Sequence, residues 1–295
     1  NNPDYANSYE PQCYVVSADE NIRSHSSSGG AFEVFAKKIF SLGGVVFGAK
    51  WDKNNQVYIG NTAKESALKD FNHSKYVYSE PRLCYKNVKQ HLVKGTYVLF
   101  SGLPCQIAAL NKYLGRKYLN LLTVEVLCGG APSPKNLYYY LKDLKEIYHC
   151  KSISIEFRDD GKWDPHIHSI YGAGQKKIPC SRWTDDPYQI AYHSTLLQSD
   201  ACKRCKFSIL PRQADITIGD CWGIEKIITP IEKNRGYSII IANNISGQNF
   251  LTDTISKFEF AKPLNLSDVL NMPNRINSKN ADYYLPSDVR TDFSK

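Results

Sequence analysis

The sequence predicts an α/β protein with a mixed, largely parallel central sheet flanked by helices and a loop-rich C-x-x-C region. First, residues 82–128 read as helix, strand, helix and strand, and the two strands of such a β-α-β unit run parallel. Second, strand-like runs at 45–49 and 238–242 each adjoin a helical pattern. Third, 295 residues with 42% hydrophobic content supply a sizeable core.

Composition excludes several classes of protein. Charged residues make up 22% of the chain, no apolar run approaches the roughly 20 residues of a membrane span, and no signal-peptide pattern is present. Nine cysteines are too few for a disulfide scaffold, so we expect reduced thiols and a cytoplasmic location. The net charge of +8 is scattered without a nucleic-acid motif, which favours a basic surface and no nucleic-acid partner.

The first motif is the run Ser26-Ser27-Ser28-Gly29-Gly30, directly before a predicted helix. The helix is indicated by apolar residues at helical spacing, namely Phe32, Phe35, Ala36, Ile39 and Phe40. Hydroxyls and backbone N–H groups at a helix start can cradle an anion, such as the phosphate of a nucleotide cofactor. The same run would also serve as an ordinary helix cap, and the sequence leaves both interpretations open.

The β-α-β unit carries two cysteines. We expect a helix over 82–94, a strand over 97–100, a helix ending at Gly115 and a strand over 121–127. Cys105 follows the first strand at a helix N-terminus, a position that lowers a thiol pKa, and Cys128 follows the second strand. Because parallel strands end at the same sheet edge, both thiols are predicted at the edge where such sheets bind ligands.

The C-x-x-C pair, Cys202 and Cys205, lets one tight turn present two sulfurs to a soft metal centre. Cys105 and Cys128 then complete a four-thiolate shell. Cys221 is a rival to Cys105 as the fourth ligand, although a strand cysteine beside Trp is more often buried packing. The remaining thiols are predicted to be packing or surface groups: Cys13, Cys84, Cys150 and Cys180.

The rest of the chain adds a predicted helix over 134–149, an alternating strand over 153–157 and a helix over 248–257. His166 and His168 stand two positions apart, which is more typical of surface or core polar groups than of metal ligands. We expect one domain over residues 1–261 and a polar C-terminal extension over 262–295.

Several segments together resemble the beta subunit family of coenzyme F-420 hydrogenase/dehydrogenase. The segments that carry the resemblance are S-S-S-G-G at 26–30, H-S-K-Y-V-Y-S at 73–79, V-L-F-S-G-L-P-C-Q-I-A-A-L at 98–110, C-G-G-A-P-S-P at 128–134, F-R at 157–158 with Trp163, the C-x-x-C at 202–205, and A-D-I-T-I-G-D-C-W-G at 214–223. They cover roughly residues 14–245 in family order, and the set is specific although each segment alone is not.

The resemblance implies an iron–sulfur flavoprotein oxidoreductase that passes electrons between a 4Fe–4S cluster, FAD and a soluble hydride carrier. The expected cluster ligands are Cys105, Cys128, Cys202 and Cys205, and the expected FAD pyrophosphate contacts are Ser27, Ser28, Gly29 and Gly30. Lys75 is the expected catalytic residue, stabilising the anionic reduced flavin. Lys203, Arg204 and Lys206 would offset the cluster charge. Relatives of this subtype often stand in bacterial polysaccharide-synthesis gene neighbourhoods, and the resemblance therefore implies a role in polysaccharide biosynthesis.

Two departures from the family pattern bear on these expectations. The two-cluster ferredoxin run of many relatives is not found in this sequence, so a ferredoxin module or redox partner protein is expected to supply electrons. Gly129 stands where relatives carry His, which removes any proton-transfer role for that side chain. The alternative is a non-enzymatic interaction module stabilised by zinc on the same four cysteines.

Overall fold

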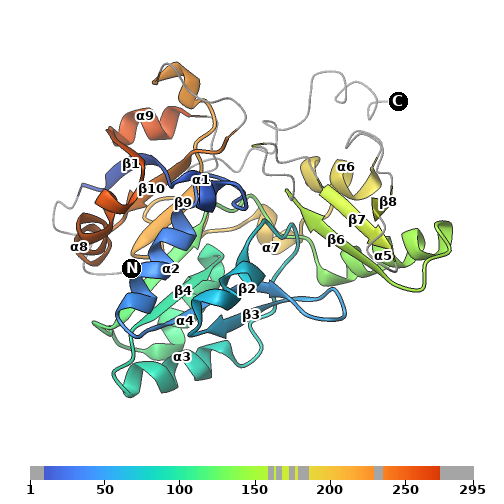
Figure 1. The fold of residues 1–295 in the computed structure, drawn as a ribbon, viewed down its shortest axis with the longest axis horizontal. Helices are drawn as coiled ribbons and strands as arrows, with labels where there is room; N and C mark the ends of the chain where they lie inside the picture. The colour runs from blue at the N-terminus through green and yellow to red at the C-terminus, as the bar shows by residue number, and fades with distance from the viewer. Residues whose placement is uncertain are drawn as a thin grey trace.

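The computed structural model describes residues 10–158, 163, 168–172, 177–178, 186–228 and 235–272. Its main element is an eight-stranded sheet with the order β11-β1-β10-β9-β5-β4-β2-β3 (Figure 1). The strands are β1 (Gln12–Ser17), β2 (Val45–Trp51), β3 (Val57–Thr62), β4 (Val98–Gly102), β5 (Leu121–Val126), β9 (Ile216–Asp220), β10 (Ser238–Ala242) and β11 (Phe260–Leu264).

The centre of this sheet is parallel and its flanks are antiparallel. Strands β2, β4, β5 and β9 pair in parallel, whereas β3, β10, β1 and β11 add antiparallel partners at the two sides. The predicted α/β class with a mixed sheet and a largely parallel core is therefore confirmed. In the described ranges, every helix is too short or too polar to cross a bilayer.

Alternation of side chains along the central strands builds a core on each face of the sheet. On β2 and β4, Val46 and Leu99 pack toward α2 (Ala31–Ser41) and α8 (Ile245–Thr254). Their neighbours Phe47 and Phe100 point the other way and pack on α3 (Cys84–Val93) and α4 (Pro104–Leu114). Because successive side chains of a strand point to opposite faces, each face of the sheet presents apolar residues to the apolar face of the helices that cover it.

A second, three-stranded sheet lies beside the main one (Figure 1) and has the order β6-β7-β8. Its strands are β6 (Ile153–Phe157), β7 (His168–Gly172) and β8 (Lys177–Ile178), and its helices are α5 (Pro134–Ile147) and α6 (Pro187–His193). Long-range hydrogen bonds join it to the main sheet region: for example, the Tyr188 hydroxyl donates to the Tyr76 carbonyl at 2.7 Å, and Asn55 Nδ2 donates to the Ile153 carbonyl at 2.6 Å.

Short elements complete the fold. They are α1 (Glu20–Arg23), α7 (Asp200–Lys203) and α9 (Leu266–Asn271), with 3-10 turns η2 (Glu65–Phe71), η5 (Ile224–Lys226) and η6 (Ile255–Lys257). Strand β11 crosses the predicted domain boundary at residue 261, and α9 buries Val269 and places Met272 against Cys221. Residues 262–272 therefore pack on the sheet, while residues 273–295 of the predicted extension lie outside the described residues.

Gly29 lies where the loop before α2 approaches the sheet most closely. A Cβ at this position would lie 2.4 Å from the Val16 carbonyl oxygen and 2.5 Å from the Ser238 nitrogen, both backbone atoms that cannot rotate away. Gly29→Ala should therefore lower the free energy of unfolding by about 1–3 kcal/mol or more in urea denaturation. Gly43→Ala is the control, since nothing lies within 4 Å and only its positive φ of 68° adds about 1 kcal/mol of strain. Equal losses would contradict the steric explanation.

Candidate cofactor site

A cavity of about 370 Å³ lies at the carboxyl ends of the four parallel strands. Its wall includes Ser101 and Gly102 from β4, Val126 from β5 and Gly219 and Asp220 from β9. Open α/β sheets bind ligands at this edge, and the volume falls within the range of small-molecule sites.

One side of the cavity is formed by the loop before α2. Gly30 is the N-cap residue with φ of 81°, no side chain caps the helix, and Ser27, Ser28 and Gly30 line the cavity. Because the first N–H groups of a helix have no partner within it, this end can receive an anion. The Ser27 hydroxyl accepts a hydrogen bond from the Ser74 hydroxyl at 3.0 Å, and the Ser28 hydroxyl donates to the Tyr237 carbonyl at 2.8 Å.

Gly29 differs from its neighbours because it is not part of the cavity wall. Its carbonyl accepts a hydrogen bond from the Ala18 N–H at 2.8 Å, and its α-carbon packs on the backbone of the sheet. The geometry gives Gly29 a close-packing role in shaping the loop. The donor set of hydroxyls and unpartnered helix N–H groups fits a dinucleotide phosphate.

Glu33 is a cavity residue that sequence reasoning missed. It lies in the first turn of α2, is 9% exposed and lines the cavity. Its carboxylate pairs with Lys37 at 3.1 Å and with His25 at 3.3 Å, so its charge beside the helix start is partly offset. The i,i+4 spacing of Glu33 and Lys37 is the sequence signal that indicates this pair.

Lys75 lines the cavity, but its ammonium is turned toward a backbone bend. Nζ donates to the carbonyls of Phe71 at 3.4 Å, Asn72 at 2.6 Å and His73 at 3.1 Å. Burial lowers the pKa of Lys75 to about 8, against the opposing attraction of Glu156 and Asp70. The side chain thus stabilises the turn after η2, and its predicted action on a flavin stays a prediction.

A second wall is built by residues that are far apart in the sequence. Arg158 is 2% exposed and binds both carboxylate oxygens of Asp220, at 2.8 and 3.2 Å. Trp163 Nε1 donates to the same carboxylate at 2.8 Å and stacks on Trp222, with ring centroids 4.4 Å apart. The Arg158 guanidinium also lies over Trp222, 5.8 Å from the ring centroid. Arg158, Asp220 and Trp222 all face the cavity.

Aromatic side chains from the second sheet extend this wall. Tyr76 stacks on Tyr192 with centroids 4.7 Å apart and packs on Phe157 at 5.1 Å. Burial raises the pKa of the Tyr76 hydroxyl to about 12, so it stays protonated at neutral pH. His193, 2% exposed at the end of α6, lines the same region. Tyr76 and Phe157 lie in the segments that carry the family resemblance, but sequence reasoning gave them no role, and it missed Tyr192 and His193 because isolated rings carry no spacing signal.

Three of the four predicted metal-binding cysteines are electrostatic neighbours. The pKa of Cys105 is raised, first by burial and then by the charges of Cys205 and Cys202. Tyr78 lies beside the same group, because its pKa is raised by burial and then by Cys105, with a smaller contribution from Cys202. The N–H groups at the start of α4 lower the Cys105 pKa as expected, but burial and the neighbouring thiols outweigh them, so the expectation of a lowered pKa is wrong in its net direction.

Cys128 lies in the loop after β5 and lines the cavity. Its Sγ accepts from the Gly130 N–H at 3.4 Å. Gln198 donates to the Gly129 carbonyl, and a β-bridge joins Gln198 to Pro132. The loop is thereby held to the segment that leads directly into α7, where Cys202 lies.

These contacts place the predicted thiols in one region, but the side chains are not arranged to coordinate a metal ion. Among the residues that the structure describes, no three His, Cys, Asp or Glu side chains are placed to hold a metal ion. Four thiols of this kind are the ligand set of a 4Fe–4S cluster, so the donor chemistry fits and the assignment of these ligands stays a prediction.

The other cysteines have different surroundings. Cys221 is fully buried, and its thiol contacts the Met272 sulfur at 3.8 Å. Burial raises its pKa to about 12, as it does for Cys13 and Cys84, which suits packing groups. Cys180, His166 and the side chain of His168 lie outside the described residues.

The enclosed ammonium of Lys75 should make stability depend on pH. Its folded-state pKa of about 8 lies below the unfolded value of 10.5, so the unfolded chain binds more protons between these values. The unfolding free energy of the wild type minus that of Lys75→Met should therefore rise with pH from 8 toward 10, by at most about 1.4 kcal/mol per unit. Chemical denaturation across this range measures the difference, and a flat difference would contradict the lowered pKa.

Comparison with known proteins agrees with this geometry. A chain of a solved structure, the xenon-derivatized F420-reducing [NiFe] hydrogenase complex from Methanosarcina barkeri, matches with a TM-score of 0.56. The match is 16% identical and covers 92% of this chain and 88% of that chain, which supports a shared fold. None of the curated protein sequences matches this chain.

A protein-family model matches residues 95–263, from the start of β4 to β11. The matched region contains all four predicted cluster cysteines together with Arg158 and Asp220, whereas the Ser27–Gly30 loop and Lys75 precede it. The match spans more than half of the sequence, and the chain belongs to the family described as the C terminus of the coenzyme F420 hydrogenase/dehydrogenase beta subunit.

Proposed function

We propose that this chain is an oxidoreductase subunit that binds FAD and a 4Fe–4S cluster and passes electrons between them and a soluble hydride carrier. Membership in a hydrogenase/dehydrogenase family supports redox chemistry in general. The observation that carries the finer proposal is the shared cavity: Cys128 lines the same space as Ser27, Ser28 and Gly30. A thiol of the proposed cluster and the proposed dinucleotide cradle thus border one site.

The loop before α2 would bind the FAD pyrophosphate. The Ser27 hydroxyl and the N–H groups at the start of α2 face the cavity and would donate to phosphate oxygens. Ser28 lines the same wall, but its hydroxyl proton is donated to the Tyr237 carbonyl, so its hydroxyl would not donate to the phosphate. Gly30 suits the N-cap position because its φ is positive and because a Cβ there would meet the Ile22 side chain at 2.6 Å. Gly29 supports the loop from behind by its contact with the sheet.

The cysteines Cys105, Cys128, Cys202 and Cys205 would hold the cluster, since four thiolates are the usual ligand set. When bound, the cluster would supply one-electron transfer and the FAD two-electron hydride chemistry. The exposed cations Lys203, Arg204 and Lys206 stand beside the C-x-x-C pair and would offset the negative charge of cluster and thiolates.

The wall formed by Arg158, Asp220 and Trp222 would orient the reacting rings and exclude water. Arg158 and Asp220 neutralise each other, and Trp222 is fixed between Trp163 and the guanidinium. Because these groups are paired with one another, they would hold the wall in one arrangement before a ligand binds. Lys75, with a pKa of about 8, would be cationic at neutral pH and is proposed to favour the anionic reduced flavin.

The electron donor is proposed to be a separate redox partner protein or a ferredoxin module. The structurally similar chain belongs to a multi-component hydrogenase complex, which supports an exchange of electrons with another protein. A cytoplasmic location is proposed from composition, and a role in polysaccharide biosynthesis from the family resemblance alone. A zinc-stabilised interaction module would also use the four thiols. It would not explain the cavity, which is lined both by Cys128 and by the loop before α2.

Metal and flavin content test the proposal directly. Anaerobically purified wild-type protein should contain about four iron atoms, four acid-labile sulfides and one FAD per chain. Cys205→Ser should lose most of the iron, because one of four ligands is removed. Cys150→Ser is the matched control, since this half-buried thiol donates to the Tyr148 carbonyl and packs on the core of the second sheet region. Colourless protein with one zinc and no flavin would instead establish the zinc module.

A negative charge introduced at Ser27, in the loop before α2, tests FAD binding independently of the cluster. Ser27→Asp should weaken FAD affinity at least about tenfold, because a carboxylate would repel the pyrophosphate at short range. Ser24→Asp, on an exposed residue of the preceding turn, should leave the affinity unchanged. Flavin fluorescence during titration measures both, and equal affinities for the two variants would place the pyrophosphate elsewhere.

A further inference from the structure

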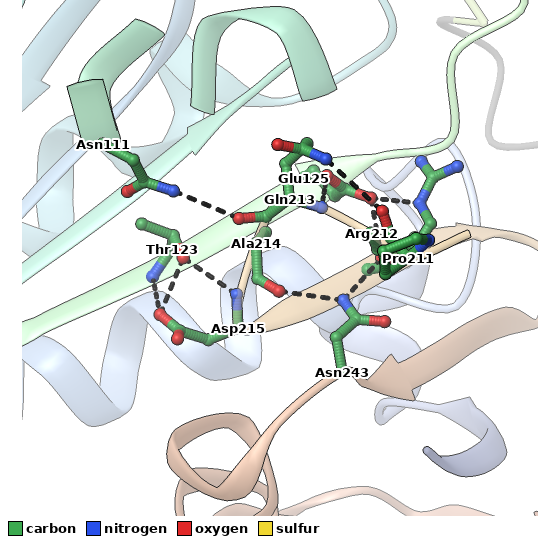
Figure 2. A network of polar contacts seen from close by, with 10 residues as sticks. Asn111, Thr123, Glu125, Pro211, Arg212, Gln213, Ala214, Asp215 and Asn243 are labelled. Atoms are coloured by element: carbon green, nitrogen blue, oxygen red, sulfur yellow. Dashed lines mark hydrogen bonds and ion pairs between the residues drawn. The ribbon is translucent and has the colours of Figure 1, made fainter. Parts of the chain in front are cut away.

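A buried polar network connects β5 with residues 211–215, which follow the C-x-x-C pair in the chain (Figure 2). Its centre is an ion pair between Arg212 Nε and Glu125 Oε1, and both side chains are fully buried. Removing two charges from water is costly, and an apolar pair of similar volume often gives equal or better stability. Stability alone therefore does not account for this pair, and the segments that it connects point to a further role.

Glu125 joins three segments of the main sheet region. It lies on β5 and accepts hydrogen bonds from the Gln213 N–H at 3.2 Å and from the Thr217 hydroxyl at 2.9 Å, in addition to Arg212. Asn243, beyond the end of β10, donates to the Thr217 hydroxyl at 2.8 Å and to the Ala214 carbonyl at 3.0 Å. The chain that enters β9 is thus fixed on both sides.

A second set of bonds fixes the same segment one step further on. The Asp215 carboxylate accepts from the Thr123 N–H at 2.8 Å and the Thr123 hydroxyl at 2.7 Å, and the Asp215 N–H donates back to that hydroxyl at 2.9 Å. Asn111 of α4 donates to the Gln213 carbonyl at 3.2 Å. Figure 2 shows these bonds converging on residues 211–215.

The connected elements are those that carry the predicted cluster ligands. Strand β5 leads into Cys128, and α4 carries Cys105 in its first turn. Residues 211–215 follow the C-x-x-C pair, and Ser208 in between donates its hydroxyl to the Cys205 carbonyl at 3.2 Å. One buried network therefore spans the three separate parts of the chain that supply thiols.

We propose that Glu125 and Arg212 are positioning residues that hold the C-x-x-C segment in register with Cys105 and Cys128. The inference rests on the proposed function, because it concerns the same four thiols. Directional bonds fix the segment at one position along β5, which apolar contacts of equal volume would not do. The pair thereby sets how closely the thiols of three chain segments approach one another.

The test replaces both charges so that the fold is retained. Glu125→Met combined with Arg212→Met avoids an unpaired buried charge, and we expect thermal unfolding of the full chain to stay close to that of the wild type. Cobalt(II) added to the reduced, metal-free protein reports thiolate ligation by its charge-transfer absorption. Loss of an outer support typically weakens metal affinity 10–100-fold, so the double variant should bind cobalt at least about tenfold more weakly.

Two further variants separate positioning from general weakening. Tyr140→Phe removes a buried hydrogen bond to Asp186 in the second sheet region and should leave cobalt affinity unchanged. The single variant Arg212→Lys keeps a cation beside Glu125. Its cobalt affinity should therefore lie between that of the wild type and that of the double variant. Unchanged cobalt affinity in the folded double variant would overturn the positioning role alone. Wild-type protein without thiolate–cobalt absorption would overturn the four-thiolate site and this inference together.

Discussion

The parallel pairing of β2, β4, β5 and β9 is the constraint on which the site depends. Parallel strands end at a common edge, so the loops that follow them must meet there whatever their distance in sequence. The cavity wall draws on the ends of β4, β5 and β9, and the start of α2 closes it from the side. Had one of these strands run antiparallel, its loop would lie at the opposite edge.

The polar groups around the cavity are arranged so that most charges are already matched. Arg158 with Asp220, Glu33 with Lys37 and Lys75 with three carbonyls each form a local set of partners. Buried groups of this kind are costly unless satisfied, and satisfied groups hold the wall in one conformation. Beside these matched charges, the cavity wall also presents neutral donors at the start of α2 and the thiol of Cys128.

Sequence patterns predicted the parts of this structure that are local and periodic. The β-α-β unit from α3 to β5 and the helix after Gly30 follow from apolar spacing, and the placement of Cys105 and Cys128 at one edge follows from strand direction. The edge strands β1 and β11 and the wall of Trp163, Trp222 and Tyr76 depend on contacts between distant segments. The Cys105 pKa was predicted in the wrong direction because the helix start is only one influence on it, and burial with the neighbouring thiols outweighs that influence.

The region matched by the family model is not a separable structural unit. Strand β2 from the preceding part of the chain pairs with β4, and β1 lies between β10 and β11. A fragment of residues 95–263 would therefore leave β4 and β10 as bare edges and β11 without its neighbour. Such edges invite pairing between molecules. Strands β1, β2 and β3 from the preceding part of the chain are interleaved with the matched region in one sheet. Evolution could therefore alter either part by substitution but could not exchange it as a module.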